Sequence, residues 1–488
     1  MKLKNVLIVV KDIEKAKKLF SLVFSFFLTI GLSLTAAAPI CANSAQRYWT
    51  GVDASGAIIM NEACPVIVES ELLTFDIQEF PDEYYQSTED YLAYSASVSA
   101  QYSFYNPADF AVTARLVFPF GTLPDYAKYE ADDTAKFDIT VDSKPIEKTL
   151  RHTLSYRGHN FEFEADIPRL HDGYVDDSFF LPDMPVTKYT YEISGIAEEY
   201  RAANAAFDAA GFDGYTKLML MEQSGGHSQD DGDFRVSTWA ENGDNFTLYA
   251  IGKPLDPAFE WTFYKDGGVE DGEEIEGGAE LVSAEELTFG ELALSARPKN
   301  SPVFDSDWYN AIVEALNRSD FGYGVVGCSE YGYGLDISRS LMRWYDYEIT
   351  LSPGERIVNS VSAPIYPSFD IGWEPAVYSY KYLLSPACTW ADFGRFDIVI
   401  NTPYYLTESS LGEFTVTDNG YSISTDGLPE GELEFTLSSA ENPVKVKHRI
   451  RDYIPIEIII SFSVIVAVLV VIISALIVLV RKKRNKLR

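Results

Sequence analysis

The stretch that decides the fold runs from residue 94 to residue 120 and reads YSASVSAQYSFYNPADFAVTARLVFPF. Its first half alternates hydrophobic and polar residues, with hydrophobic side chains at Ala96, Val98, Ala100, Tyr102 and Phe104. The turn-forming residues 106–109 follow, and the alternation resumes at Val112, Ala114, Leu116 and Phe118. A period of two is typical of strands that bury one face. We therefore predict a β-hairpin whose hydrophobic residues face one sheet interior.

The same pattern recurs along the chain. It predicts strands at 137–141, 246–252, 260–264, 343–351, 357–365, 377–383, 396–400, 414–417 and 421–424. A turn at 142–145 predicts a second hairpin, and Asp418-Asn419-Gly420 is a strong tight-turn signal. Helical spacing appears at 196–211 and at 308–317, where Ser306 is placed to cap the helix. The fold class expected is mainly β, with two β-sandwich-like modules at 48–195 and 335–440 and a short mixed α/β acidic region at 196–334.

The segment from Tyr94 to Phe120 resembles the opening of the vault/inter-alpha-trypsin domain, in which a strand ending in an Asn-Pro turn pairs with one ending in Phe-Pro-Leu. Asn106-Pro107 and Phe118-Pro119-Phe120 carry this resemblance, which covers about 45 residues. This segment and residues 380–398 are also similar to uncharacterised bacterial secreted proteins. The resemblance implies an all-β module and no particular activity.

The two ends of the chain predict a location. Residues 1–42 combine six lysines, an apolar run and small residues in the order of a secretory signal peptide, cleaved after Ala42 or Ser44. Cys41 follows Ile40, a poor fit to a lipidation signal. Residues 458–480 contain no charge and are long enough to span a bilayer, after a stalk at 441–457. The basic tail at 481–488 predicts a cytoplasmic C-terminus and an extracellular N-terminal domain at the cell membrane. A sortase signal is not matched, since residues 442–446 lack the Thr at which cleavage occurs.

Charge excludes one class of partner. The chain carries −34, and because both ends are basic the part between them carries −44, which disfavours nucleic acid. Two acidic clusters, at 230–233 and 266–278, invite Ca²⁺ binding but lack the spacing of a calcium loop. Cleavage of the signal peptide leaves Cys64, Cys328 and Cys388, which allows one disulfide with a free thiol, or three buried thiols.

A search for catalytic or metal-binding constellations yields no committed site residue and no cofactor. The histidines, among them His152 and His159, lie at no ligand spacing, and Cys328 lies in no nucleophile motif. Asp336, Ser338 and Ser340 match the Asp-x-Ser-x-Ser form of the metal-ion-dependent adhesion site in von Willebrand A domains, but no buried apolar strand precedes them. We interpret them as a polar turn entering a strand and expect no metal there.

These observations favour a single-pass membrane protein with an extracellular β-rich part acting in surface binding, adhesion or envelope sensing. Aromatic residues form 14% of the chain, which makes protein or glycan the expected partner. The alternative is an envelope hydrolase that uses two carboxylates, for which the sequence offers many acids and no constellation. Two close carboxylates in a pocket would favour the enzyme, and an exposed aromatic patch would favour binding.

Overall fold

The computed structural model describes residues 54–55, 57–60, 64–81, 88–121, 136–154, 166–200, 202–209, 216–221, 225–230, 233–265, 272–299, 301–318, 323–327 and 335–446. Among these residues, no helix has the length and apolarity needed to cross a membrane. The expected signal peptide at 1–42 and membrane span at 458–480 lie outside them. The described fold is mainly β, as the sequence predicts.

Contacts divide the chain into two compact units. In the small unit, β23 (Trp373–Glu374) pairs with β30 (Val444–Lys445), and the ammonium of Lys445 lies 5.6 Å from the centre of the Trp373 ring. The large unit contains residues 48–368 and 378–437 and is built from five sheets.

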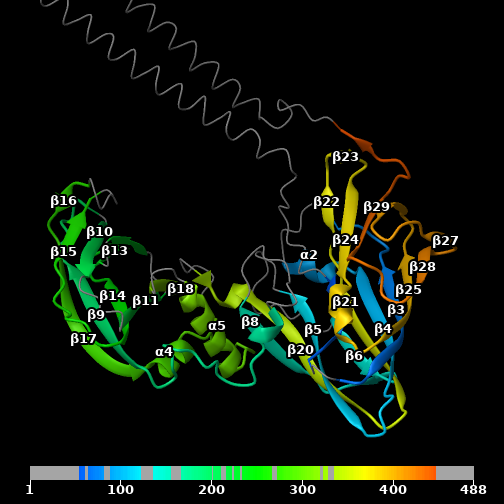
Figure 1. Cartoon of the computed structure of the whole chain (residues 1–488). Coiled ribbons are helices and arrows are strands. Elements are labelled where there is room, and N and C mark those ends of the chain that lie inside the picture. The colour runs from blue at the N-terminus through cyan, green and yellow to red at the C-terminus, as the bar shows by residue number, and fades with distance from the viewer. Residues whose placement is uncertain are drawn as a thin grey trace, which may run out of the picture. The chain divides into compact units, whose positions relative to one another are not determined.

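The largest sheet has eight strands in the order β27-β28-β25-β3-β4-β21-β6-β7 (Figure 1). Their bounds are β27 Thr415–Thr417, β28 Gly420–Asp426, β25 Phe393–Asn401, β3 Ile67–Asp76, β4 Ser97–Tyr105, β21 Arg356–Pro364, β6 Asp138–Val141 and β7 Lys144–Pro145. Strand β4 is antiparallel to both β3 and β21, and β25 is parallel to β3. Strands from the N-terminal and C-terminal parts of the sequence are therefore interleaved within one sheet.

Two smaller sheets cover the inner face of this sheet. One has the order β2-β5-β20-β8, with bounds β2 Ile58–Ile59, β5 Val112–Gly121, β20 Leu341–Leu351 and β8 Thr149–Leu154. The other contains β1 Ala54–Ser55, β24 Val377–Leu383, β29 Leu433–Ser438, β26 Tyr405–Ser409 and β22 Ser368–Asp370. Between the eight-stranded sheet and the first of these sheets, the Tyr347 hydroxyl donates to Asn359 Oδ1 at 3.1 Å. Between the eight-stranded sheet and the second, the rings of Phe75 and Tyr382 meet edge to face. The result is a β-sandwich.

This sandwich changes the expected domain organisation. Segments 48–195 and 335–440 were expected to form separate sandwiches, but β3, β4 and β5 pair with β25, β21 and β20 respectively. The physical reason is that each segment supplies strands with one hydrophobic face but lacks the neighbours that complete its sheets. The two segments form one module.

The predicted hairpin at 96–118 is wrong in its pairing, although both strands exist. Strand β4 belongs to the eight-stranded sheet and β5 to the opposite layer, so residues 106–111 form an arch between layers. Asn106 is fully buried, and its Nδ2 donates to the carbonyls of Phe110, Leu351 and Ser352 at 2.8–3.1 Å. Leu351 and Ser352 lie at the start of a second arch, which connects β20 to β21, so Asn106 links the two arches. Phe104, Leu116 and Phe118 are buried as predicted.

The chain between the halves of the sandwich forms a second set of layers. One sheet has the order β17-β9-β14-β11-β18-β19: β17 Gly278–Thr288, β9 Pro185–Ser194, β14 Asn245–Gly252, β11 Thr216–Met221, β18 Tyr323–Gly327 and β19 Leu335–Asp336. The other has the order β12-β13-β10-β15-β16: β12 Gly225–Asp230, β13 Asp233–Ala240, β10 Ala203–Ala209, β15 Trp261–Tyr264 and β16 Glu274–Ile275. Tyr191 and Phe246 of the first sheet pack with Phe207 of the second.

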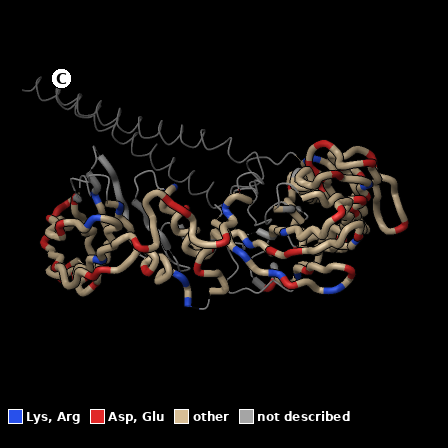
Figure 2. Tube along the Cα trace, turned by 60° about the horizontal axis from the view of Figure 1, so that its bottom comes forward, with Lys and Arg blue, Asp and Glu red and all other residues tan. Residues whose placement is uncertain are grey.

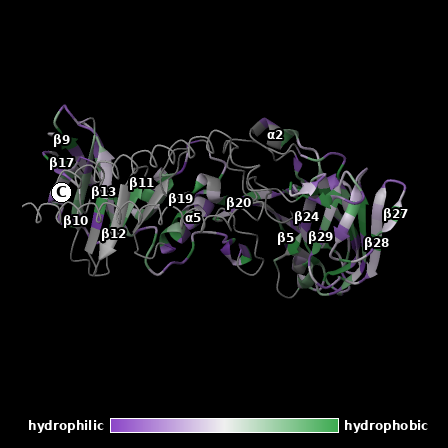
Figure 3. Ribbon diagram, turned by 90° about the horizontal axis from the view of Figure 1, so that it is seen from above, coloured by the Kyte–Doolittle hydropathy of each residue, from purple (hydrophilic) through white to green (hydrophobic). Residues whose placement is uncertain are grey.

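Helices α4 (Phe289–Ser295) and α5 (Asp305–Asn317) cover the other face of the first of these sheets. Val186, Met219 and Ile251 meet Trp308 and Ile312 of α5 in one hydrophobic cluster. Figure 3 shows that α5 carries both hydrophobic and hydrophilic residues, as expected for a helix that buries one stripe. The remaining short helical elements are α2 Thr88–Ala93, η3 Ile167–Arg169, η4 Ser338–Ser340 and η5 Ser385–Thr389.

The helix predictions are partly wrong. The Ala-rich segment expected to form a helix at 196–211 contains strand β10, which pairs with β13 on one side and β15 on the other. Packing between two neighbours overrides the intrinsic helix preference of Ala. Helix α5 is confirmed but starts one residue before Ser306, with Phe304 at the N-cap. Helix α4 was not predicted, although Thr288 and Glu291 form a capping box.

The tight turns are confirmed. Thr417 pairs with Gly420 in the hairpin of β27 and β28, so the tight turn predicted at Asp418-Asn419-Gly420 is present, with Asp418 and Asn419 as its two loop residues. A second hairpin forms after β6 as predicted, but its turn is only Asp142-Ser143, both at positive φ, and Lys144-Pro145 of the predicted turn form strand β7. These local signals succeed because the turn residues themselves fix the backbone.

Candidate functional site

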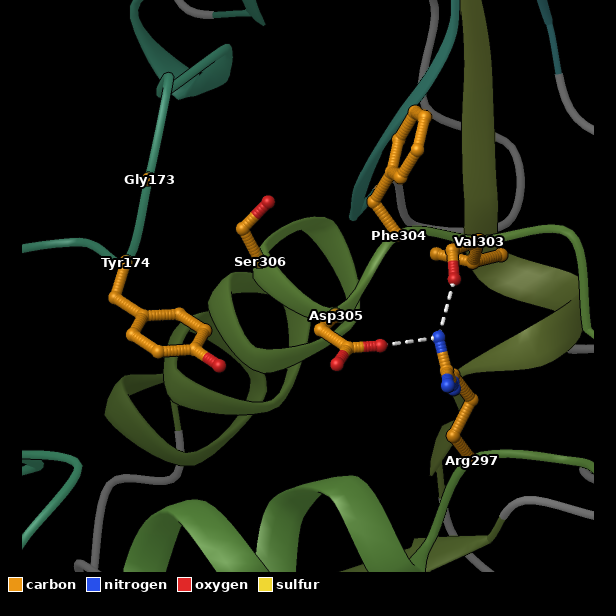
Figure 4. A pocket seen from close by; sticks show the side chains of 7 residues that line it. All are labelled: Gly173, Tyr174, Arg297, Val303, Phe304, Asp305 and Ser306. Atoms are coloured by element: carbon orange, nitrogen blue, oxygen red, sulfur yellow. Dashed lines mark hydrogen bonds and ion pairs between the residues drawn. The ribbon is translucent and has the colours of Figure 1, made fainter.

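A pocket lies at the N-terminal end of α5 (Figure 4). It is lined by Gly173 and Tyr174 of the segment before β9, by Arg297 after α4, and by residues 303–306. Its volume is about 450 Å³, within the range of about 300–1,000 Å³ that is usual for small-molecule sites. In Figure 4, Asp305 lies between Tyr174 on one side and Arg297 on the other.

Two aromatic side chains of the pocket are open to solvent. Tyr174 is 47% exposed and Phe304 is 48% exposed. The Tyr174 ring rests against the buried ring of Tyr309, with ring centres 4.5 Å apart. Asn310 holds the backbone on both sides of Tyr174, because its Nδ2 donates to Gly173 O at 2.9 Å and its Oδ1 accepts from Val175 N at 2.8 Å. Tyr174 is therefore an exposed ring on a fixed backbone.

The polar groups of the pocket form one ion pair with unused capacity. Nη1 of Arg297 donates to Asp305 Oδ1 at 2.6 Å and to Val303 O at 2.7 Å. Within the described part of the chain, Arg297 Nη2, Asp305 Oδ2 and Ser306 Oγ have no hydrogen-bond partner. The pocket thus offers a donor, an acceptor and a hydroxyl while its charges cancel.

A network of ion pairs supports the pocket from behind. Arg151 of β8 contacts the buried Asp307 of α5 through Nε and Nη2, and Asp307 also accepts from the backbone N–H of His152 at 2.8 Å. Arg115 of β5 donates to both Asp172 and Asp346, and its bond to Asp172 lowers the pKa of that carboxyl. Since Asp172 precedes Gly173 and Asp307 follows Ser306, the network fixes both walls of the pocket to the sandwich.

Within the described residues, no group of three or more His, Cys, Asp or Glu side chains could hold a metal ion. His152 is buried, and burial, with Arg343 and Arg151 nearby, lowers its pKa to about 3, so the imidazole is neutral. His159 and Cys328 lie outside the described residues. Because His152 is buried, a substrate or metal ion could reach its imidazole only if the surrounding core opened.

The adhesion-site match adopts the predicted turn. Asp336 ends the two-residue strand β19, and Ser338 and Ser340 bound the single turn η4, which leads directly into β20. Ser340 is buried, and its backbone N–H donates to Ile337 O. Strand β20 follows where a metal-site domain would require a helix, which agrees with the predicted turn. The side chain of Asp336 is not among those described.

The thiols and acidic clusters are spread over the molecule. Cys64 and Cys388 are free, and Cys388 is exposed, so of the two alternatives left open the one with three buried thiols fails at Cys388. Burial raises the pKa of the Cys64 thiol. In the first acidic cluster, Asp230 at the end of β12 pairs with Asp233 at the start of β13, and much of the second cluster lies outside the described residues. Acidic residues occur along the whole described trace rather than in one patch (Figure 2).

A pair of catalytic carboxylates does not occur at this pocket: Asp305 is the one carboxylate among its described lining residues. The sequence did not single out Tyr174, Arg297 or Phe304. In the sequence, Tyr174 is only an aromatic residue after a glycine, and Phe304 only lies near the start of a predicted helix. Many other positions share these features, so they do not identify a site. Their meeting depends on how α5 packs against the segment before β9.

Comparison with known proteins gives little further information. No family model matches the chain, and no curated protein matches it. The crystal structure of a "putative nutrient binding protein" from Legionella pneumophila aligns with 80% of this chain and 72% of its own chain, at 10% identity and a TM-score of 0.31. A likeness at this TM-score carries no argument about this protein.

Proposed function

We propose that the protein is a membrane-anchored, extracellular binding protein that takes a small polar ligand in the pocket at the start of α5. The observation that carries this proposal is the pair of exposed rings, Tyr174 and Phe304, beside polar groups with unused bonding capacity. Small-molecule sites combine apolar surface with a few placed polar groups in this way. Adhesion and envelope sensing are both forms of this binding role.

The membrane anchor and the extracellular location rest on the ends of the sequence. The signal-peptide pattern at 1–42 and the uncharged span at 458–480 with its basic tail support them. An acidic part with a charge of −44 suits an exposed, soluble surface beside a membrane. The partner we expect at the cell surface is a glycan or a protein.

Gly173 provides the test. A Cβ at this position meets no atom within 4 Å, and the backbone has no positive φ, so Gly173→Leu adds a side chain at the pocket without backbone strain. We expect compounds from a library of polar metabolites to bind the full-length protein in detergent, measured by ligand-observed NMR. Gly173→Leu should weaken this binding at least tenfold.

The matched control is Gly278→Leu, because a Cβ at Gly278 makes only an ordinary contact with Ser194 O at 3.8 Å, away from the pocket residues. This variant should bind as the wild type does. If no compound distinguishes Gly173→Leu from the wild type, the pocket is not the binding site and the proposal is wrong.

A further inference from the structure

We propose that the ligand of this pocket is a neutral saccharide, bound with one face of a sugar ring against Tyr174 and its hydroxyls on Arg297, Asp305 and Ser306. This inference rests on the proposed function and names the ligand class of the same site. It is carried by the combination of a fixed exposed ring, an electroneutral polar pair and a free hydroxyl.

The ring of Tyr174 provides the stacking surface. One part of it is supported by Tyr309, and its backbone is held on both sides by Asn310, so it loses little freedom when a ligand packs on it. A sugar ring presents C–H groups on one face, and these pack against aromatic rings. The rigid support makes Tyr174 suited to this contact.

The polar groups match hydroxyl chemistry. A sugar hydroxyl both donates and accepts, and neighbouring hydroxyls can bond a donor and an acceptor placed side by side. Arg297 Nη2 can donate, Asp305 Oδ2 can accept, and Ser306 Oγ can do both. The ion pair, with Arg297 Nη1 and Asp305 Oδ1 2.6 Å apart, already fixes the positions of these two side chains relative to each other.

The charge balance selects a neutral ligand. Arg297 is matched by Asp305 within the pocket, so no net positive charge remains to hold an anion. The surrounding part of the chain carries −44 and repels anions at longer range. Uronic acids should therefore bind more weakly than the corresponding neutral sugars.

The test uses the full-length protein in detergent, with isothermal titration of glucose, galactose, N-acetylglucosamine and their short oligosaccharides as probes. Glucuronate and galacturonate are the matched acids. We expect saturable binding of at least one neutral probe and at least tenfold weaker binding of its acid. Tyr174→Ala should weaken the neutral probe at least tenfold, and Tyr174→Phe should retain it because the ring remains.

Two further variants locate the interaction. Phe110→Ala removes an aromatic side chain that is 58% exposed but does not line the pocket, and it should bind as the wild type does. Asp305→Asn removes the balancing charge, and it should weaken the neutral probe while narrowing the gap to the acid. Circular dichroism confirms that each variant is folded.

The outcomes separate this inference from the proposed function. If library compounds other than saccharides bind in a Gly173-dependent way while no saccharide does, the pocket is a binding site and the saccharide assignment is wrong. Stronger binding of the acids than of the neutral sugars also overturns it. If saccharides bind and Gly173→Leu has no effect, they bind elsewhere, and both the inference and the proposed site fail.

Discussion

Glu71 is a carboxyl group buried in the sandwich interior. It lies on the inward face of β3, opposite Tyr102 on β4, and the hydroxyl of Tyr382 approaches from the facing layer. Within the described part of the chain, Glu71 Oε1 has no hydrogen-bond partner. Burial raises the pKa of Glu71 to about 8, against the opposing effect of a hydrogen bond with Tyr102. At neutral pH the folded chain therefore holds a protonated glutamic acid.

The stability of the protein should fall as the pH rises through this range. Since the pKa of Glu71 is near 4.5 in the unfolded chain and near 8 in the folded chain, the folded state binds the extra proton between these values. The contribution is complete below about pH 4.5 and is lost as the pH approaches 8. Glu71→Gln should remove this dependence and raise the free energy of unfolding at pH 7 by at most about 3 kcal/mol.

Chemical denaturation of the wild type and Glu71→Gln from pH 5.5 to 7.5 checks this expectation. The difference between the two curves should change by about 1.4 kcal/mol per pH unit. Glu348→Gln, an exposed change on β20, should leave the slope as in the wild type. Parallel curves for Glu71→Gln and the wild type would contradict the assigned proton.

At the level of the element, alternation in the sequence predicts a strand and its buried face but not its partner. The hydrophobic residues of β4 and β5 are buried as their alternation predicts. The two strands nevertheless belong to opposite layers, because the arch at 106–111 crosses the core. The tight turn at Asp418 and Asn419 is predicted correctly because two residues decide it. Strand β10 is missed because its two neighbours, rather than its own residues, decide its conformation.

Asn106 is the residue that joins the two arches. Asn106→Ala removes the donor to Phe110 O, Leu351 O and Ser352 O and the acceptor of the Ala108 N–H. Buried carbonyls then lose their partner, at about 1–3 kcal/mol each where no water replaces the bond. We expect the free energy of unfolding to fall by about 2–4 kcal/mol in urea denaturation.

Asn106→Asp keeps the acceptor and loses the donors, so it should destabilise the protein by a similar amount. Asn245→Ala, at an exposed asparagine of β14, is the control and should change stability by less than about 1 kcal/mol. An Asn106→Ala variant as stable as this control would show that the arches do not depend on the side chain.

For the whole molecule, the sequence predicts the fold class and the strands with the clearest alternation, but it misses many other strands and the arrangement of the modules. The halves of the sandwich pair through β3 with β25 and β4 with β21, partners that no local pattern identifies. The same limit applies to the pocket, where Tyr174 and Arg297 come from segments separated by most of the inserted sheets. Contacts between distant segments carry both the architecture and the candidate site.

The interleaved sandwich predicts how fragments behave. Residues 335–446 alone contain β20, β21 and β25 without their partners β5, β4 and β3, so we expect an unfolded chain by circular dichroism and NMR. Co-expression with residues 43–172 should restore strand content and yield a complex that purifies together. A well-dispersed NMR spectrum from 335–446 alone would show that this segment is an independent domain.

The arch contact between Asn106 and Leu351 also sets an order in time, because 245 residues separate the two. At a synthesis rate of about 5–20 residues per second, the first strands of the sandwich wait roughly 12–50 s for their partners. The inserted sheets between them are complete earlier. We therefore expect the inserted sheets to fold before the sandwich that flanks them. During the wait, the growing chain exposes the apolar faces of its first strands, and chaperones that bind unfolded chains can protect them from aggregation.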